Sequence, residues 1–433
     1  MLNRSQQPPL HTVGKVDIPL PEKHVMPNGI TLNVLNTTDE EMIRLDLLMN
    51  GGGLWYQSQP LQATFANNML RQGTRQFSSE KVAERLDYYG GWLESSTTIK
   101  HSYLTLYSLS RYFPQLVELL RSVVMGPLYP EKELSVMVER ERQQFKVSNQ
   151  RVDVKCRKAF RRALFGTDFP SARYAVLEDY GRLTSETLAE FHHKFYHSGN
   201  CSIYLSGKVT AEAIRLVEEA FGSTPWGETY FVRPSYTHKP VTSQEKRVTV
   251  TCDQTVQSAV NLGFISIDAL HPDFHKLRVL VTLFGGYFGS RLMKNIREDK
   301  GYTYGIGAGL QGFPGCSLLF VSTQTANEYV EPLIREVYAE MDRLRRETVS
   351  EDELMMVKNY MMGELNRAYE GPLSLADAYI FLATSELPYS FMADTARAIS
   401  EVTAPELREL ACRYLLDERV TEAVAGAAIG KNT

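Results

Sequence analysis

The strongest constraint on the fold is an internal repeat, because it requires the chain to fold as two copies of one unit. Three short segments of the first half recur in the second half: residues 110–113 (SRYF) at 327–330 (NEYV), an offset of 217; residues 133–134 (EL) at 353–354 (EL), an offset of 220; and residues 183–184 (LT) at 402–403 (VT), an offset of 219. Chance matches would scatter their offsets, whereas these are nearly equal. We therefore infer a duplicated domain.

The expected secondary structure is similar in the two copies. In the first copy, apolar spacing predicts strands over residues 30–36, 42–49, 93–109 and 202–206, and helices over 61–71, 80–89, 114–125, 131–164 and 185–196. In the second copy it predicts strands over 248–267 and 304–323, and helices over 276–298, 328–346, 351–386 and 405–415. Strands mixed with segregated helices predict an α+β fold, built as two duplicated α/β sandwich domains.

The boundary between the copies is marked by a change of composition. The chain has 433 residues, more than one hydrophobic core usually organises. Pro225, Pro234 and Pro240 stand among polar residues, which is typical of an exposed connection. We expect an N-terminal domain over residues 1–224, a linker over 225–246 and a C-terminal domain over 247–433.

Composition excludes several functional classes. The net charge is −4, and no basic run is long enough to form a nucleic-acid footprint. The chain has no stretch of eighteen apolar residues, and its N-terminus is polar. The five cysteines are scattered singly, which predicts reduced thiols. We therefore expect a cytoplasmic protein with neither a nucleic-acid partner nor a membrane partner.

Four segments carry motifs: residues 63–74, which follow the glycines at 51–53; residues 90–97 (GGWLESST); residues 196–207; and residues 290–304 (SRLMKNIREDKGYTY). Together they resemble the pitrilysin/insulinase (inverzincin) family of metallopeptidases, over nearly the whole chain. The last motif is the most specific, because it has several residue types at fixed spacing. The resemblance implies the family's two-domain fold and a site for peptides.

The resemblance also identifies a lost metal site. In active members of the family, an H-x-x-E-H helix presents two histidines to Zn²⁺ and a glutamate that activates the bound water. Here Thr64 and Asn68 stand at the histidine positions and Asn67 at the glutamate position. The family's third ligand, a glutamate, should fall near residues 145–148, where no carboxylate occurs. A hydroxyl and two carboxamides hold zinc poorly, so we expect no metal in this chain and no peptide hydrolysis by it alone.

Two histidine pairs are candidates for a relocated metal site. His193 and His197 are four residues apart, and so are His271 and His275. Neither pair has an evident third ligand, so neither predicts a zinc centre.

The substrate side of the family's site is retained. Arg297 and Tyr304 stand where the resemblance implies an Arg/Tyr pair that contacts the substrate backbone opposite the zinc, and Gly301 between them is suited to end a helix. Arginine offers forked donors to a carbonyl, and a tyrosine hydroxyl can stabilise a developing oxyanion. The structural alternative is that Arg297 pairs with Glu298 or Asp299 while Tyr304 packs.

Some bacterial members of the family are split into a zinc-bearing subunit and a subunit with the Arg/Tyr pair. The resemblance therefore implies a non-catalytic, substrate-binding subunit of a heterodimeric zinc metalloendopeptidase. Its expected partners are a peptide substrate and a zinc-bearing homologous subunit, or a second copy of itself, with zinc in the partner. One alternative is a structural or assembly protein of the same fold, and another is an active enzyme with an unrecognised centre.

Overall fold

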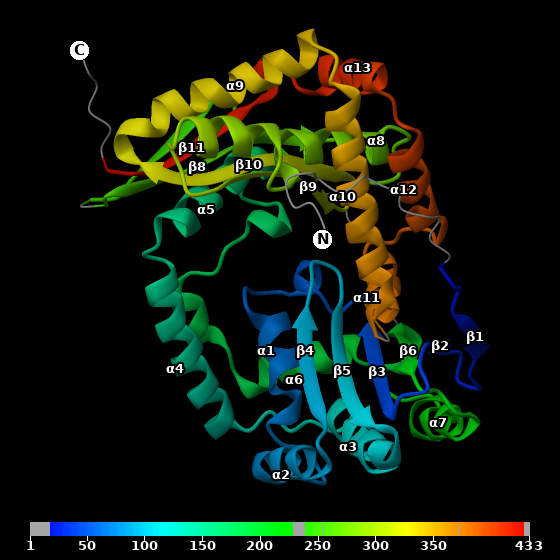
Figure 1. The fold of residues 1–433 in the computed structure, drawn as a ribbon. Helices are drawn as coiled ribbons and strands as arrows, with labels where there is room; N and C mark the ends of the chain where they lie inside the picture. The colour runs from blue at the N-terminus through cyan, green and yellow to red at the C-terminus, as the bar shows by residue number, and fades with distance from the viewer. Residues whose placement is uncertain (1–17, 228–238, 254, 372, 428–433) are drawn as a thin grey trace, which may run out of the picture.

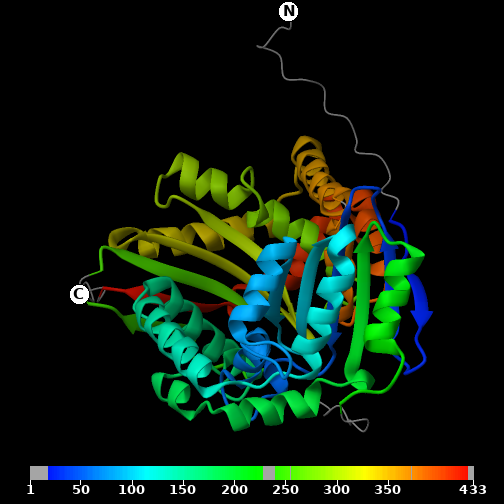
Figure 2. The ribbon, with the colours of Figure 1, turned by 90° about the horizontal axis from the view of Figure 1, so that it is seen from below.

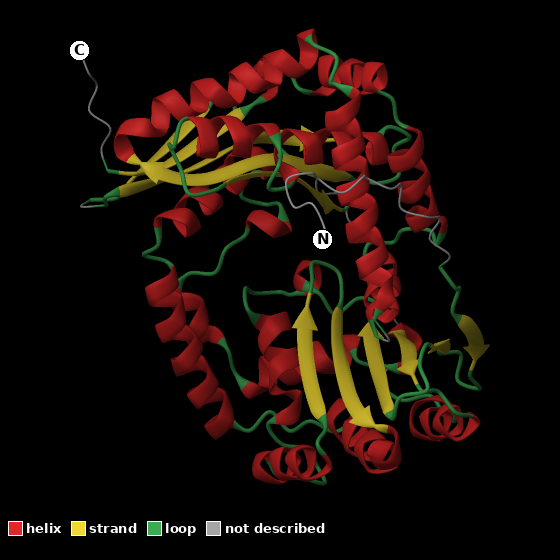
Figure 3. Ribbon diagram, in the orientation of Figure 1, coloured by secondary structure: helices red, strands yellow, loops and turns green. Residues whose placement is uncertain are grey.

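The fold contains two separate β-sheets, each with its own set of helices (Figures 1 and 3). The computed structural model describes residues 18–227, 239–253, 255–371 and 373–427. The central part of the expected linker, residues 228–238, lies outside the described residues. Seen from below (Figure 2), the first domain lies in front of the second sheet, so the two domains are stacked.

The first sheet has the strand order β1-β2-β6-β3-β5-β4. Its strands are β1 (Glu22–Val25), β2 (Thr31–Asn36), β3 (Met42–Met49), β4 (Trp92–Thr97), β5 (Ser102–Leu109) and β6 (Cys201–Gly207). The helices of this half are α1 (Gln62–Asn68), α2 (Ser79–Tyr89), α3 (Phe113–Met125), α4 (Glu131–Ser148), α5 (Val152–Phe165), α6 (Ser185–Phe195) and α7 (Ala211–Val217). Only the β2–β6 pair of this sheet is parallel.

The second sheet has the order β7-β11-β8-β10-β9. Its strands are β7 (Arg247–Thr251), β8 (Gln257–Ser266), β9 (Ile306–Phe313), β10 (Cys316–Ala326) and β11 (Thr421–Gly426). The helices are α8 (Phe274–Val281), α9 (Val330–Arg346), α10 (Glu351–Glu370), α11 (Ser374–Thr384), α12 (Ser390–Glu401) and α13 (Ala404–Tyr414). With β1 set aside, both sheets have the same order and each has one parallel pair, β7–β11 here. The predicted α+β fold with two duplicated domains is confirmed.

Several expected elements were too long. The strand expected over residues 93–109 is the hairpin β4–β5, and the one expected over 304–323 is the hairpin β9–β10. The helix expected over 131–164 is broken between α4 and α5, and the one over 351–386 between α10 and α11. The reason is physical: apolar alternation continues on both sides of a short turn, so periodicity alone does not locate the turn.

The break between α4 and α5 has a large consequence, because α5 crosses to the other half. It packs against β7, β8 and β11 of the second sheet, and in Figure 1 it lies beneath that sheet, on the side of the first domain. The thiol of Cys156 on α5 donates to the carbonyl of Ala423 on β11 at 3.2 Å. Reciprocally, α11 of the second half packs on the first sheet, where its Tyr379 joins a buried cluster with Leu48 and Tyr204. Each half therefore contributes one helix that packs on the sheet of the other half.

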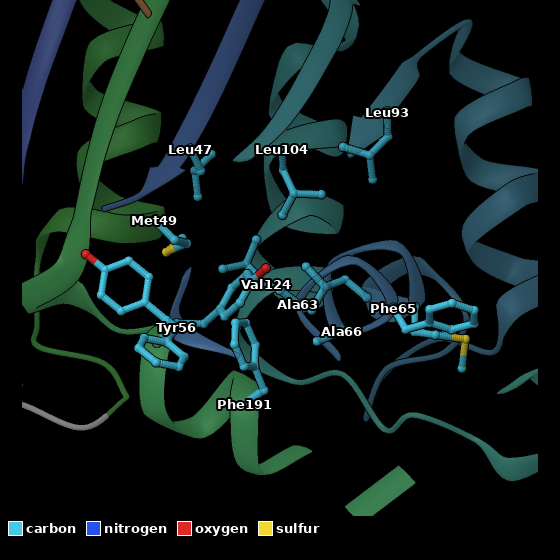
Figure 4. Packing of buried hydrophobic residues seen from close by; sticks show 14 of the residues in the cluster. Leu47, Met49, Tyr56, Ala63, Phe65, Ala66, Leu93, Leu104, Val124 and Phe191 are labelled. Atoms are coloured by element: carbon cyan, nitrogen blue, oxygen red, sulfur yellow. The ribbon is translucent and has the colours of Figure 1, made fainter. Parts of the chain in front are cut away.

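The opposite face of each sheet carries the main cores. On the first sheet, Leu47 and Leu104 face helices α1, α3 and α6, and Figure 4 shows them with Ala63 and Phe65 of α1 and Phe191 of α6. On the second sheet, the core lies between the strands and α8, α9 and α13. No helix in the described parts of the chain is long and apolar enough to cross a membrane.

Candidate functional site

Helix α1 carries the three positions at which the resemblance places the zinc motif. Ala63, Phe65 and Ala66 are buried against the first core, which fixes the rotation of the helix about its axis. Thr64 and Asn68, one turn apart, are partly buried, whereas Asn67 is 1% exposed. The helix therefore presents these residues towards the β4–β5 hairpin, with Asn67 innermost.

The Asn67 amide forms a network of hydrogen bonds. Its Nδ2 donates to the carbonyls of Ser96 at 2.8 Å and Tyr103 at 3.3 Å, which are paired across β4 and β5. Its Oδ1 accepts from the hydroxyl of Tyr196 at 3.0 Å, next to the C-terminal end of α6. The amide therefore ties α1 to both strands of the hairpin and to the end of α6. Its donor and acceptor capacity is used inside the protein.

The zinc ion that the family implies does not fit these residues. Asn68 Oδ1 accepts from the Ser95 hydroxyl at 2.8 Å, and Asn67 is engaged as described. Thr64 adds only a neutral hydroxyl, so the helix offers neither charge nor imidazole nitrogen. In the described part of the chain, no three histidine, cysteine, aspartate or glutamate side chains gather in a way that could hold a metal.

The place expected for the third ligand is filled by aromatic rings. Phe145, near the end of α4, lies 5.6 Å from the ring of Tyr180, which in turn lies 6.2 Å from the ring of Phe65 on α1. Such contacts join α1 to α4 by apolar packing. No carboxylate takes part in these contacts.

The histidines of the two candidate pairs differ in burial and in hydrogen bonding. His193 is exposed while His197 is fully buried. Nδ1 of His271 accepts from the N–H of Asp273 at 3.1 Å, and Nδ1 of His275 is 3.0 Å from the Thr395 hydroxyl. These nitrogens serve local hydrogen bonds.

Arg297 and Tyr304 stand on either side of a sharp turn. Arg297 belongs to the π-helical segment Met293–Asp299, and the chain then reverses at Gly301, whose φ of 66° is left-handed. The N–H of Tyr302 donates to the carbonyl of Ile296 at 3.0 Å and closes the helix end. Glycine makes this turn without the strain that a side chain would add.

The side chains of the pair are held differently. The Arg297 guanidinium lies over the ring of Phe288, 4.6 Å from its centroid. None of the described residues, Glu298 and Asp299 included, forms an ion pair with it, and the structure shows no hydrogen bond between Arg297 and Tyr304. Tyr304 is 93% exposed. The packing and pairing that the structural alternative requires are therefore not present in this structure.

The backbone at Tyr304 is fixed although its side chain is not covered. The hydroxyl of Thr303 lies 2.7 Å from the carbonyl of Gln324 on β10, and it accepts from the N–H of Gly305 at 3.1 Å. Thr303 itself is buried. Tyr304 therefore projects from an anchored loop, which limits the entropy lost when its hydroxyl binds a partner.

A polar pocket of about 470 Å³ opens beside Tyr304 on the α5 side of the second sheet. Asp153 and Arg157, one turn apart on α5, line it together with strand residues such as Asn261. The sequence did not identify these α5 residues as part of a site. Their i, i+4 spacing was visible, but the single helix expected over residues 131–164 kept them in the first domain.

Comparisons with known proteins agree with the motifs. The family model described as insulinase (peptidase family M16) matches residues 62–167, and the one described as peptidase M16 inactive domain matches residues 182–361. An uncharacterized zinc protease of Bacillus subtilis is 21% identical over 356 residues, covering 81% of this chain and 84% of the relative. An uncharacterized zinc protease of Mycobacterium bovis is 26% identical over 370 residues, covering 84% of this chain and 83% of the relative.

Solved structures show the same fold. The crystal structure of a peptidase M16 inactive domain from Pseudomonas fluorescens superposes with a TM-score of 0.83 at 20% identity, covering 95% of this chain and 100% of that one. The crystal structure of a protease from Helicobacter pylori superposes with a TM-score of 0.82 at 16% identity, covering 94% of this chain and 100% of that one. The first family match contains α1, and the second contains Arg297 and Tyr304. The chain therefore belongs to the M16 peptidase family, and its second half matches the domain of that family described as inactive.

Proposed function

We propose that this chain is the non-catalytic, peptide-binding subunit of a heterodimeric zinc metalloendopeptidase, acting in the cytoplasm with a homologous subunit that holds the zinc. The observation that carries the proposal is the state of Asn67. At the position of the family's catalytic base stands an amide that is 1% exposed and already bonded to two carbonyls and a phenol. An amide does not take a proton from water near neutral pH, so cleavage requires another chain.

Tyr304 and Arg297 support a role in binding. Tyr304 offers a hydroxyl on an anchored loop, and Arg297 offers guanidinium donors that no carboxylate of the described chain occupies. Both groups suit the carbonyl oxygens of a peptide. Among the described strands, β4 pairs with β5 alone, so the backbone groups on its other edge that no side chain occupies are open to an extended peptide.

The need for zinc favours a heterodimer over a pair of identical chains. Two copies of this chain would bring two helices that each carry Thr64, Asn67 and Asn68, and neither would hold the metal. Relatives described as zinc proteases support a partner from the same family. Such a partner would supply the metal and the base, and this chain would position the substrate.

The test mixes the purified chain with an M16 homologue from the same genome that carries an intact H-x-x-E-H motif. We expect cleavage of a fluorogenic peptide by the mixture only, with loss of activity on chelation. Arg297→Ala or Tyr304→Phe should lower kcat/KM roughly tenfold to hundredfold, as loss of a donor near the reacting carbonyl does. Lys294→Ala, an exposed change on the same helix as Arg297, is the matched control and should have no effect.

Three outcomes would contradict the proposal or part of it. Chelator-sensitive cleavage by this chain alone would show that it has its own metal centre. A stable but inactive complex would instead favour the structural or assembly role. An active mixture that is indifferent to both substitutions would remove Arg297 and Tyr304 from the binding site.

A further inference from the structure

The pocket beside Tyr304 has a distinctive chemical character. It is lined by Arg157 and Asp153 of α5 and by polar strand side chains, among them Gln257, Asn261 and Gln324. A volume of about 470 Å³ is ample for one or two amino-acid side chains. Tyr304 itself lines the pocket, so the pocket adjoins a peptide held at Tyr304.

The two charged residues of the pocket differ in availability. Asp153 accepts two hydrogen bonds from Arg151, Nε to Oδ1 at 3.0 Å and Nη2 to Oδ2 at 2.9 Å, so its charge is compensated. Arg157 is exposed, and no hydrogen bond or ion pair joins it to any residue that the structure describes. The net free charge at the pocket is therefore positive.

The rest of helix α5 reinforces this charge. Five cations on this helix have no carboxylate partner among the described residues: Lys155, Arg157, Lys158, Arg161 and Arg162. Their recorded partners are neutral: the Asn149 amide for Lys158, the Gln311 amide for Arg161, and the Tyr174 ring for Arg162. The whole chain, this helix included, has a net charge of −4. A cluster of one sign on a single helix creates a local positive potential.

Electrostatics inside the cluster agree with this description. The pKa of Lys158 is lowered, mainly by burial and further by the neighbouring charges of Arg162 and Arg157. The cations therefore repel each other, and a bound anion would relieve that repulsion.

We propose that the pocket beside Tyr304 is a subsite for an acidic side chain of a bound peptide, with Arg157 as the residue that recognises the carboxylate. This inference rests on the proposed peptide-binding function and names its substrate class: peptide segments that carry aspartate or glutamate. The guanidinium donates to the carboxylate, while Gln324 offers a further amide donor from β10. Basic segments are disfavoured by the same helix.

The test measures binding of the full chain to two short fluorescein-labelled peptides, identical except for one glutamate that is replaced by glutamine. Fluorescence anisotropy at low ionic strength should give a Kd roughly three- to tenfold lower for the glutamate peptide, as expected for one charge-assisted hydrogen bond at a partly exposed site. Arg157→Ala should abolish this preference and leave the Kd of the glutamine peptide unchanged. Arg162→Ala removes the same charge from the same helix outside the pocket, and should keep the preference.

The outcomes separate this inference from the function on which it rests. Equal affinity of the unmodified chain for both peptides overturns the acidic subsite and leaves peptide binding intact. A preference that survives Arg157→Ala, or that disappears equally in Arg162→Ala, also overturns it, because general charge and not the pocket would then be responsible. If neither peptide binds, the proposed function fails, and the subsite fails with it.

Discussion

Replacing Asn67 with alanine should destabilise the first domain substantially, because this side chain joins three elements at once. The substitution removes the donor for the carbonyls of Ser96 and Tyr103 and the acceptor for the hydroxyl of Tyr196. All of these groups lie around a side chain that is 1% exposed, so water reaches them poorly. The loss is therefore one of buried hydrogen bonds left unmade.

The magnitude follows from the partners. Each buried group left unsatisfied costs roughly 1–3 kcal/mol, and Tyr196 can turn to Ser102, a neighbour that already interacts with its hydroxyl. We therefore expect a loss of about 2–4 kcal/mol in the free energy of unfolding. Asn68→Ala is the matched control: it removes one hydrogen bond, from Ser95 at 2.8 Å, on a partly buried residue, and should cost about 1 kcal/mol or less.

The assay uses a probe that the chain already contains. Of the three tryptophans, Trp55 and Trp92 lie in the first domain and Trp226 packs against its core, so their fluorescence during urea unfolding reports on the first domain. Asn67→Asp should be worse than alanine near neutral pH, because a carboxylate would face two carbonyl oxygens in a buried place, and it should improve as pH falls and the acid becomes a donor. Equal costs for Asn67→Ala and Asn68→Ala would refute the reasoning.

Two further predictions concern buried charge and pH. Asp46→Asn should lower the free energy of unfolding in urea by about 3–5 kcal/mol, because Arg44, only 3% exposed, loses a charged partner at 2.8 Å. Asp377→Asn removes the exposed partner of Arg44 on α11 and should cost about 1 kcal/mol or less. Equal costs for the two substitutions would contradict this. Burial lowers the pKa of His192 from 6.5 to about 4, although its Nε2 lies 2.8 Å from the Val124 carbonyl. The unfolded chain therefore takes up a proton first, and stability falls as pH drops from about 6.5 to 4, by up to about 3 kcal/mol. His192→Gln should narrow the difference between urea midpoints measured at about pH 7 and pH 5, and an unchanged difference would show that other groups cause it.

The repeat was the part of the fold that could be predicted from the sequence, because it depends on short-range features such as helix caps and turns. Thr184 and Thr403, which are 219 residues apart, cap α6 and α13 at equivalent places, each accepting from the backbone N–H three residues later. Capping depends on a few neighbouring residues, so it can be recognised without a structure. The turn at Gly301 was predictable for the same reason.

The exchange of helices was not predictable in this way. Nothing in the spacing of residues 152–165 distinguishes an apolar face that packs on the first sheet from one that packs on the second. The choice is made by contacts such as that of Cys156 with Asn261, 105 residues away. Arg157 reaches the pocket of Tyr304 only because α5 crosses over.

That Thr64, Asn67 and Asn68 are poor zinc ligands follows from the sequence alone, because the ability to hold a metal depends on their own atoms. What the Asn67 amide does instead was decided by the tertiary structure. Its partners Ser96, Tyr103 and Tyr196 lie 29, 36 and 129 residues away, and no local pattern connects them. Donor chemistry belongs to a residue, whereas burial and hydrogen-bond partners belong to the whole fold.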